Sequence, residues 1–346
     1  MKIIIDAMGG DHAPDEIVKG ALMSAAEFGI EVILVGRGED ILASMRKGGW
    51  DTLPSGVEIA NADDVVDMEA DPAKVLQQHK GSSMVLGLKM LADGQGDAFI
   101  SAGNTGALLT AATLVVKRIH GIRRAALAPV LPIGCGTILM DAGANVSCTP
   151  EFLLQFGCMG SLYAQKTQKK ENPRVALLNN GTETSKGDEL RKEAYALLEK
   201  AGQDGLINFI GNMEAREAVG GDVDVLVADG FAGNVFLKAM EGTAIYMSGL
   251  LKKMFKKNIL TLLAALFCKK GIGEIKKQMD YRNVGGSMIV GISKPVIKAH
   301  GSSDAVAIRG AIRQAMNAVE TDFCETIREN VSKMVLPREA KNADKA

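Results

Sequence analysis

Short apolar runs alternate along the chain with longer segments that carry helical periodicity. Most of the runs are followed by a glycine-bearing turn and then by a helical pattern. The runs predict buried strands at Lys2–Asp6, Val32–Val35, Val57–Ala60, Ala98–Ser101, Thr137–Asp141, Val175–Leu178, Ile207–Ile210, Val223–Ala228 and Pro295–Ala299. This alternation is typical of βαβ units. It predicts an α/β fold in which a mostly parallel sheet is covered by helices on both faces.

Two helices show clear sequence signals. Pro14, followed by Asp15 and Glu16, predicts a first helical turn, because proline is preset for that position and acids favour the positive end of the helix dipole. A long last helix is predicted from about Ser302, with apolar residues three or four apart at Ile308, Ile312, Ala315, Val319, Phe323, Ile327 and Val331. Residues 1–336 are expected to form one α/β unit without a readable internal boundary, and 337–346 a polar tail.

Composition narrows the class of protein. The 346 residues carry a net charge of −1, and aromatic residues make up only 4%, which argues against a dedicated nucleic-acid binder. The five cysteines form no CxxC pair and lie at no zinc-ligand spacing from a histidine, so neither a metal site nor a disulfide framework is expected. The amino-terminal segment lacks the apolar core of a signal peptide, which favours a cytoplasmic location.

Three glycine-rich loops after predicted strands are candidate anion sites. The first is SAGNTG, where Ser101, Asn104 and Thr105 offer donors and Gly103 lets the backbone approach an anion; the alternative is a simple helix cap. The second is DGFAGN, with Asp229 and Asn234, followed one turn later by Lys238. The third, NNGTETSKG, holds Lys186, although a lone loop lysine is usually a solvated charge. Three such loops favour one shared anionic ligand.

Two further loops contribute ionisable groups. DAMGGDHAP brings Asp6, Asp11 and His12 after the first strand, either as part of a cleft or as a turn in which Asp11 caps the next helix. KAHGSSDA places His300 after a strand, either as a proton shuttle or as a structural hydrogen-bonding residue. The sequence contains no GxSxG nucleophile elbow, no complete Walker A motif and no complete dinucleotide fingerprint. These absences argue against a covalent serine enzyme, a P-loop NTPase and a standard Rossmann dehydrogenase.

The segment from Leu250 to Lys277 carries eight lysines and one acid, a local charge of +7. If it is helical, Leu251, Phe255, Ile259, Leu262 and Leu266 form one apolar stripe, and Leu263 adds to it. Lysines around a short apolar tip are typical of a helix or hairpin that lies on an anionic membrane surface. A dimer seam and a docking surface for an acidic protein are the alternatives. The apolar run from Asn258 to Cys268 has eleven residues, too few to cross a bilayer.

Taken together, these motifs resemble the bacterial phosphate acyltransferase family. The resemblance runs in order through DAMGGDHAP, SAGNTGAL, DAGAN, PEFLLQFGCMG, LLNNGTETSKG, NFIGNMEAR, DGFAGNVFLK and VIKAHGSSDA, which spans nearly the whole chain. Two segments depart from the family pattern: QQHKGSSM replaces a more basic run, and GGSMIVGI replaces GGAPLLG. These changes put carrier or phosphate contacts and the acyl groove in question.

The resemblance implies a three-layer fold similar to isocitrate and isopropylmalate dehydrogenases and to phosphotransacetylase. Turn chemistry and a change in helix character near residue 245 separately predict a protruding amphipathic helical element over 245–280. The resemblance also implies transfer of an acyl group from acyl-acyl-carrier-protein to inorganic phosphate for phospholipid synthesis, by a homodimer that associates peripherally with the membrane. An acyl-CoA:phosphate acyltransferase is the nearest alternative, followed by a decarboxylating dehydrogenase and a non-catalytic lipid-binding scaffold. No metal or cofactor is expected.

A leaving thiol with a pKa near 8.5 needs little acid catalysis, so positioning and electrostatics are expected to dominate. The expected catalytic residues are Lys186, His300, Asn234 and Lys238, and the expected substrate-binding residues are Ser101, Gly103, Asn104, Thr105, Asp229, Asp6 and Asn145. Phosphate is placed among Asn104, Thr105, Lys186 and the SAGNTG amides. Membrane contact is expected from Phe255, Ile259, Leu262, Leu263 and Leu266.

Overall fold

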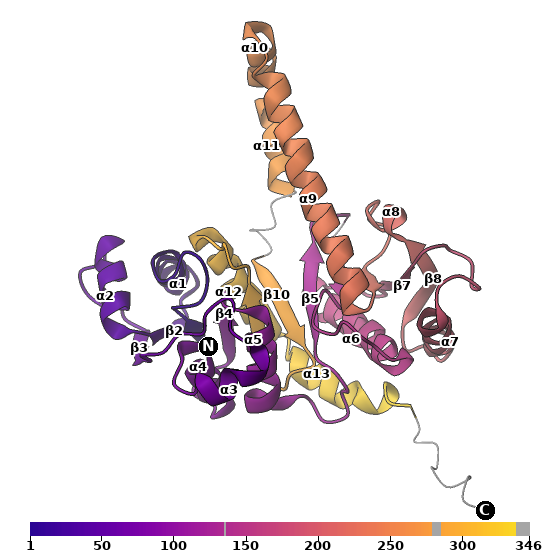
Figure 1. Ribbon diagram of the computed structural model, residues 1–346, viewed down its shortest axis with the longest axis horizontal. Helices are drawn as coiled ribbons and strands as arrows, with labels where there is room; N and C mark the ends of the chain where they lie inside the picture. The colour runs from indigo at the N-terminus through magenta and orange to yellow at the C-terminus, as the bar shows by residue number, and fades with distance from the viewer. Residues whose placement is uncertain (135, 279–284, 337–346) are drawn as a thin grey trace, which may run out of the picture.

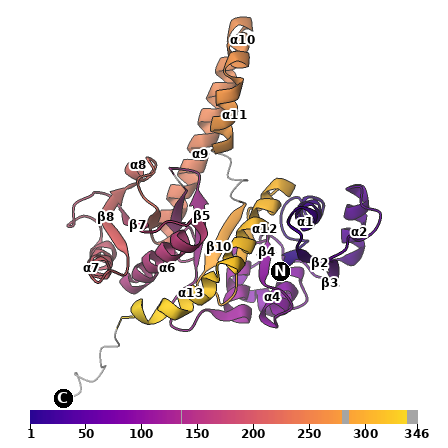
Figure 2. The ribbon, with the colours of Figure 1, turned by 180° about the vertical axis from the view of Figure 1, so that it is seen from behind.

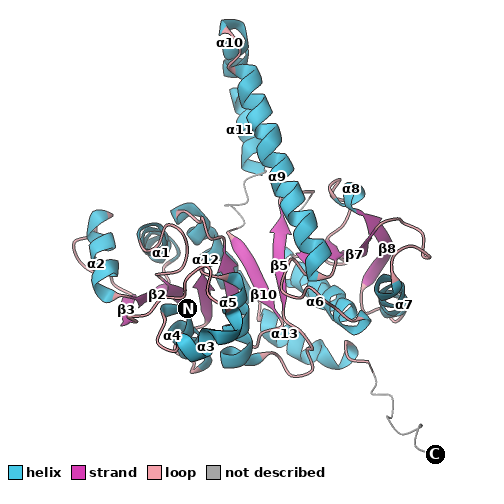
Figure 3. Ribbon diagram, in the orientation of Figure 1, coloured by secondary structure: helices cyan, strands magenta, loops and turns pink. Residues whose placement is uncertain are grey.

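The computed structural model describes residues 1–134, 136–278 and 285–336, and for residues 274–278 it describes the backbone only. Its described part is built on one eleven-stranded sheet in the order β3-β2-β1-β4-β11-β10-β5-β6-β9-β7-β8. The strands are β1 Lys2–Asp6, β2 Glu31–Gly36, β3 Val57–Asn61, β4 Ala98–Ser101, β5 Ala126–Leu131, β6 Thr137–Met140, β7 Arg174–Asn179, β8 Asn208–Glu214, β9 Val225–Val227, β10 Gly286–Val290 and β11 Val296–Ala299. The sheet runs through the centre of the molecule (Figure 3).

Strand direction reverses within this sheet. β3, β2, β1, β4 and β11 are mutually parallel, and β6, β9, β7 and β8 form a second parallel group. Between the groups, β11–β10, β10–β5 and β5–β6 are antiparallel pairs. Three reversals in succession leave the second group running opposite to the first. The carboxyl ends of the two groups therefore lie at opposite edges of the sheet.

Helices cover both faces and make three layers. The helices are α1 Asp15–Phe28, α2 Gly38–Lys47, α3 Val75–Gln78, α4 Ser83–Ala92, α5 Thr105–Ala111, α6 Pro150–Gln168, α7 Glu189–Gln203, α8 Ala215–Ala218, α9 Gly230–Phe255, α10 Ile259–Phe267, α11 Lys269–Gln278, α12 Ala305–Glu320 and α13 Phe323–Asn330. The helices α1, α6, α12 and α13 pack on one face of the sheet and share a continuous apolar cluster with it (Figure 2). The other face buries α4 and α5 over the first strand group and the start of α9 over the second.

The predicted strands are confirmed to within a few residues, and two central strands were missed. β5 contains Pro129, which breaks the usual appearance of an inner strand, and β10 begins with Gly286 and Ser287. Both lie between the two parallel groups. The sequence therefore did not predict the reversal of strand direction that β5 and β10 cause in the middle of the sheet.

The helix boundaries need two corrections. α1 begins at Asp15, with Pro14 at the N-cap and no side-chain cap bond, so Asp11 does not cap this helix. The long last helix is divided into α12 and α13, because Asp322 adopts a left-handed conformation with φ of 48°. Asp304 begins α12 by accepting a hydrogen bond from the Ala307 amide at 2.9 Å. The predicted polar tail, 337–346, lies outside the described residues.

α9 passes over the sheet and projects beyond the body, α10 lies at the end of the projection, and α11 returns beside α9 (Figure 1). The predicted single stripe is divided, because α9 ends at Phe255 and α10 begins at Ile259. Asn258 caps α10: its side chain accepts from the Thr261 amide at 2.9 Å, and its amide donates to the Thr261 hydroxyl at 3.0 Å. Leu251 and Phe255 therefore belong to one helix, and Ile259, Leu262 and Leu266 to the next.

Candidate active site

Three loops meet where β1, β4 and β11 end, and we call this place the carboxyl edge of the first strand group. The strands are direct neighbours and parallel, so the loops after them leave the sheet together. The Asp11 amide donates to the Gly301 carbonyl at 2.8 Å. A Cβ added to Gly9 would lie 2.7 Å from the Gly103 nitrogen, which shows that backbone meets backbone here. The sequence supplies glycine where this close approach requires it.

Asp6 hydrogen-bonds to the loop after β1 and to Ser101 at the end of β4, and so holds the loops after these two strands together. Its side chain accepts a hydrogen bond from the Ser101 hydroxyl at 2.6 Å and another from the Met8 amide at 3.2 Å. The Ser101 oxygen in turn accepts from the Gly103 amide at 3.1 Å. Burial raises the pKa of Asp6, and the hydrogen bonds from Ser101, Ser83 and the backbone act in the opposite direction. Asp6 and Ser101 are both buried, so they hold the shape of this edge from inside.

Lys298 lies at the same edge and was not singled out from the sequence. It is 7% exposed in a strand whose other residues are fully buried. Its ammonium donates to the Ala102 carbonyl at 3.2 Å and to the Ala299 carbonyl. Burial lowers its pKa to about 8, while the charges of Asp6 and Asp11 act to raise it. The available signal was a lysine inside the otherwise apolar strand VIKA.

His300 follows Lys298 by two residues and is exposed. Its Nδ1 lies 2.9 Å from the Ser302 hydroxyl oxygen and accepts from the Ser302 amide at 3.3 Å, which places the ring proton of neutral His300 on Nε2. Partial desolvation of the imidazole by its surroundings lowers the pKa of His300, and the nearby positive charges of Lys238 and Lys298 lower it further. The imidazole is thus neutral at physiological pH and can accept a proton.

α9 brings two charges to the carboxyl edge of the first strand group. Lys238 pairs with Glu241 at 2.8 Å, and both charges act on the pKa of His300. The helix begins at the opposite edge of the sheet and reaches this edge two turns later (Figure 1). The charge of Lys238 therefore acts on His300, and a shared catalytic site for these two residues stays a prediction.

Asn104 and Thr105 begin α5. The Asn104 side-chain oxygen accepts from the Ala107 amide at 2.9 Å, and its nitrogen donates to the Met68 and Ala70 carbonyls at 2.7 and 3.2 Å. Asn104 thus caps the helix, as the alternative interpretation had it, and ties the Met68 segment to this edge. Thr105 is exposed. Substrate binding by these two residues stays a prediction.

The remaining predicted residues lie at the other edge, where β6, β7 and β9 end. The Asp229 side chain caps α9 through the Ala232 amide at 2.9 Å and pairs with Arg191. The side-chain nitrogen of Asn145 donates to the Ala125 carbonyl at 2.8 Å, and the side-chain nitrogen of Asn234 donates to the Ala142 carbonyl at 3.2 Å. These side chains hold the loops of the second strand group in place. Their action on substrate remains a prediction.

Lys186 belongs to this second edge as well. Its side chain is 47% exposed and lies 3.9 Å from a carboxylate oxygen of Glu183. The three glycine-rich loops therefore do not converge on one edge: SAGNTG lies at one, and the loops after β7 and β9 at the other. The reversal at β10, β5 and β6 is the reason, and the binding of one anion by all three loops stays a prediction.

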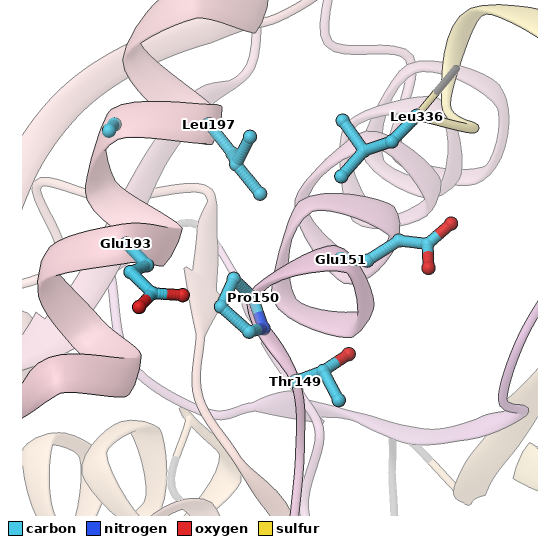
Figure 4. A pocket seen from close by; sticks show the side chains of 7 residues that line it. Thr149, Pro150, Glu151, Glu193, Leu197 and Leu336 are labelled. Carbon is cyan, nitrogen blue, oxygen red and sulfur yellow. The ribbon is translucent and has the colours of Figure 1, made fainter. Parts of the chain in front are cut away.

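Two pockets open on the second half of the molecule. One, of about 410 Å³, is lined in part by Cys148, Asp188 and Arg191. Burial, with the charge of Asp141, raises the pKa of Cys148 to about 12, so its sulfur is an unreactive thiol. A larger pocket of about 570 Å³ lies between the start of α6 and α7, where Leu197 and Leu336 approach from opposite sides (Figure 4). Neither pocket is lined by Lys298 or His300.

The side chains that the structure describes include no group of three or more His, Cys, Asp or Glu that could hold a metal ion. None of the helices in the described part of the chain is long and apolar enough to span a membrane.

The fold matches that of solved phosphotransacetylases and related dehydrogenases. A phosphotransacetylase from Streptococcus pyogenes superposes with a TM-score of 0.62 at 17% identity, covering 94% of each chain. A 4-hydroxythreonine-4-phosphate dehydrogenase from Klebsiella pneumoniae superposes with a TM-score of 0.53 at 13% identity, covering 92% of this chain and 99% of the other. The protein thus has the mixed α/β fold of these enzymes.

Sequence comparison gives the family. Residues 1–326 match the family model described as "Fatty acid synthesis protein". The phosphate acyltransferase of Thermoanaerobacter pseudethanolicus is 45% identical over 336 residues, covering 96% of this chain and 98% of the relative. That of Listeria innocua is 45% identical over 337 residues, covering 96% and 97%. The chain belongs to the phosphate acyltransferase family, and it is an acyltransferase of lipid biosynthesis.

Proposed function

We propose that this enzyme transfers a fatty acyl group from acyl-acyl-carrier-protein to inorganic phosphate, forming an acyl phosphate for phospholipid synthesis. The observation that carries the proposal is the carboxyl edge of the first strand group, where a neutral histidine and two lysines surround glycine-rich loops. Positive charge beside backbone that can be approached closely suits a phosphate dianion. Membership of the phosphate acyltransferase family supports phosphate and an acyl donor as the substrates.

The chemistry asks little of the protein beyond placement. A phosphate oxygen attacks the thioester carbonyl, the carbon–oxygen bond forms, and the carbon–sulfur bond breaks as the thiolate leaves. Because the thiol is a good leaving group, the main demands are orientation and stabilisation of the tetrahedral oxyanion. Lys238 is placed to stabilise developing charge, and His300 to take up the phosphate proton on Nδ1 by way of the Ser302 hydroxyl, which lies 2.9 Å from it. Lys186 and Asn234 are proposed to contribute from the second edge.

The identity of the donor is tested by supplying both thioesters. Purified enzyme is incubated with long-chain acyl-acyl-carrier-protein or with acyl-CoA, each with and without phosphate. Free thiol is followed, and acyl phosphate is trapped with hydroxylamine. We expect phosphate-dependent thiol and hydroxamate from the carrier substrate. Turnover of acyl-CoA alone would instead establish the phosphotransacetylase-like alternative, and no turnover of either would favour a lipid-binding scaffold.

We also propose that α10 rests on an anionic membrane surface while the body remains in the cytoplasm. Within α10, Leu262, Leu263 and Leu266 are 50%, 48% and 64% exposed, and Ile259 is 71% exposed. Phe255 is only partly exposed, so its contribution is smaller. Lysines 252, 253, 256, 257, 269 and 270 flank this apolar end. Such a helix gains from apolar burial at the acyl boundary and from attraction to anionic headgroups.

We also propose that the enzyme is a homodimer whose subunits contact each other through α9. Phe231, Val235 and Ile245 of α9 are 64%, 54% and 73% exposed. Exposed apolar side chains along one long helix are a natural surface for a second copy of the chain. Sedimentation or light scattering on the purified enzyme tests this directly, and a monomer at micromolar concentration would count against it.

A further inference from the structure

Lys298 differs from several other lysines of the body in two respects: it is buried, and its ammonium forms no ion pair with a carboxylate of the described residues. Lys170, Lys238 and Lys2 each pair with a carboxylate, at 2.6, 2.8 and 2.8 Å respectively. The Lys298 ammonium instead donates to two backbone carbonyls. Carbonyls are neutral, so they orient the ammonium without cancelling its charge. An ammonium has three N–H groups, and these two contacts use two of them.

The position of Lys298 is as informative as its contacts. Ala102 belongs to the loop after β4, and Ala299 ends β11, so the ammonium lies at the base of two of the three loops that meet at this edge. The loops after β1, β4 and β11 pack closely at this point, because a Cβ on Gly10 would lie 2.9 Å from both the Ala102 side chain and the Gly301 carbonyl. Lys298, which is 7% exposed, thus lies at an edge where the backbones of the three loops pack closely together.

A buried positive charge is costly unless a negative charge accompanies it. Asp6 and Asp11 act on Lys298 from the β1 side, and Lys238 acts on it from α9. Burial raises the pKa of Asp6, which weakens that carboxylate as a permanent counter-ion. A dianion arriving at this edge would supply the missing negative charge.

From this geometry we infer that Lys298 supplies the fixed positive charge that holds inorganic phosphate at the carboxyl edge of the first strand group. The inference rests on the proposed function for its substrate, and it makes Lys298 a phosphate-binding residue. Ala102 and Ala299 orient its ammonium, and Asp6, through Ser101, keeps the loop after β4 in place. Lys238 and His300 then act on the reacting side of the same phosphate.

The first test is substitution with a matched control. Lys298→Met keeps the length of the side chain and removes its charge. Lys294→Met is the control, because Lys294 also donates to a backbone carbonyl, that of Leu91 at 2.8 Å, but it precedes β11 at the opposite end of the strand. We expect Lys298→Met to raise the KM for phosphate and its calorimetric Kd at least tenfold, with a smaller change in kcat. Lys294→Met should leave both within twofold of wild type.

The second test does not require Lys298 to be replaced. Because the Lys298 pKa is about 8, phosphate affinity should fall above that pH as the ammonium loses its proton. Phosphate itself is chiefly a dianion there, so the ligand does not cause the fall. Asp11→Asn removes a charge that raises the Lys298 pKa, and Asp11 is exposed, so this variant is expected to fold. The alkaline limb of phosphate affinity should move to lower pH in Asp11→Asn.

Unchanged phosphate affinity in folded Lys298→Met would overturn the inference, and so would an alkaline limb that does not move in Asp11→Asn. Calorimetry with inorganic phosphate alone separates this inference from the proposed reaction. Phosphate binding that depends on Lys298, in an enzyme that does not use acyl-acyl-carrier-protein, would leave the site in place and reject the donor. Acyl transfer that is insensitive to Lys298 would do the reverse.

Discussion

The ionisable side chains at the carboxyl edge of the first strand group take their charge states from burial. Burial raises the pKa of Asp6 and lowers that of Lys298, and partial desolvation together with two nearby lysine charges lowers that of the exposed His300. His300 is therefore neutral and able to take a proton, while Lys298 stays charged up to a pH of about 8. Sequence alone identified His300 and Asp6 from their loops. It missed Lys298, because a lysine within an apolar strand reveals its burial only when the neighbouring strands are known.

Lys238 gives a pH prediction at the residue scale. Its positive charge lowers the pKa of His300, so Lys238→Met should raise that pKa. The acid limb of the kcat profile, below which His300 is protonated, should then move to higher pH. Lys252→Met, an exposed lysine further along α9, is the control and should leave the limb in place. An acid limb that is the same in Lys238→Met and wild type would exclude coupling between Lys238 and His300.

Lys186 gives a kinetic prediction. If its ammonium contributes to the developing charge, Lys186→Ala should lower kcat at least tenfold without loss of the folded state, because the side chain is exposed and only loosely paired with Glu183. Steady-state kinetics and a thermal melt measure both quantities. Wild-type kinetics would remove Lys186 from the mechanism and leave the first edge as the whole phosphate site.

At the scale of elements, strands and helices with regular patterns were predictable and interruptions were not. The apolar runs located β1, β4 and β11 closely. The stripe from Leu251 to Leu266 suggested one helix, but the Asn258 cap divides it into α9 and α10. A capping box ends one helix and begins the next through hydrogen bonds between polar side chains and the backbone. The three- and four-residue spacing of apolar side chains carries no information about these hydrogen bonds.

α10 gives the prediction that belongs to this scale. Leu262 is 50% exposed, and burying a leucine is worth about 1.5–3 kcal/mol. Leu262→Asp loses that gain and adds a charge that anionic lipid repels, so the amount of protein that floats with anionic liposomes should fall at least tenfold. Activity on a substrate in solution should persist.

Leu53→Asp, a substitution of an exposed leucine on the body, is the control and should float as wild type does. Equal flotation of Leu262→Asp and wild type would contradict the membrane proposal and leave α10 as a dimer seam or carrier-docking surface.

At the scale of the whole molecule, topology decides which residues meet. The α/β class and the parallel strand groups followed from the alternation of patterns along the chain. The division into two opposed groups did not, because it depends on β5 and β10, whose proline, glycine and serine obscure the strand pattern. One consequence is that SAGNTG and Lys186 leave the sheet at opposite edges.

The central claim for the whole enzyme is that phosphate itself attacks the thioester, without an acyl-enzyme intermediate. The neutral, partly buried Cys148 thiol and the hydrogen-bonded Ser101 support this, because neither is prepared as a nucleophile. The most direct measurement is a single turnover with enzyme in excess over acyl-acyl-carrier-protein and phosphate omitted, in which the carrier thiol is followed. We expect no thiol until phosphate is added, and then one equivalent per acyl group. A burst of thiol without phosphate, together with an enzyme heavier by one acyl group, would contradict the account.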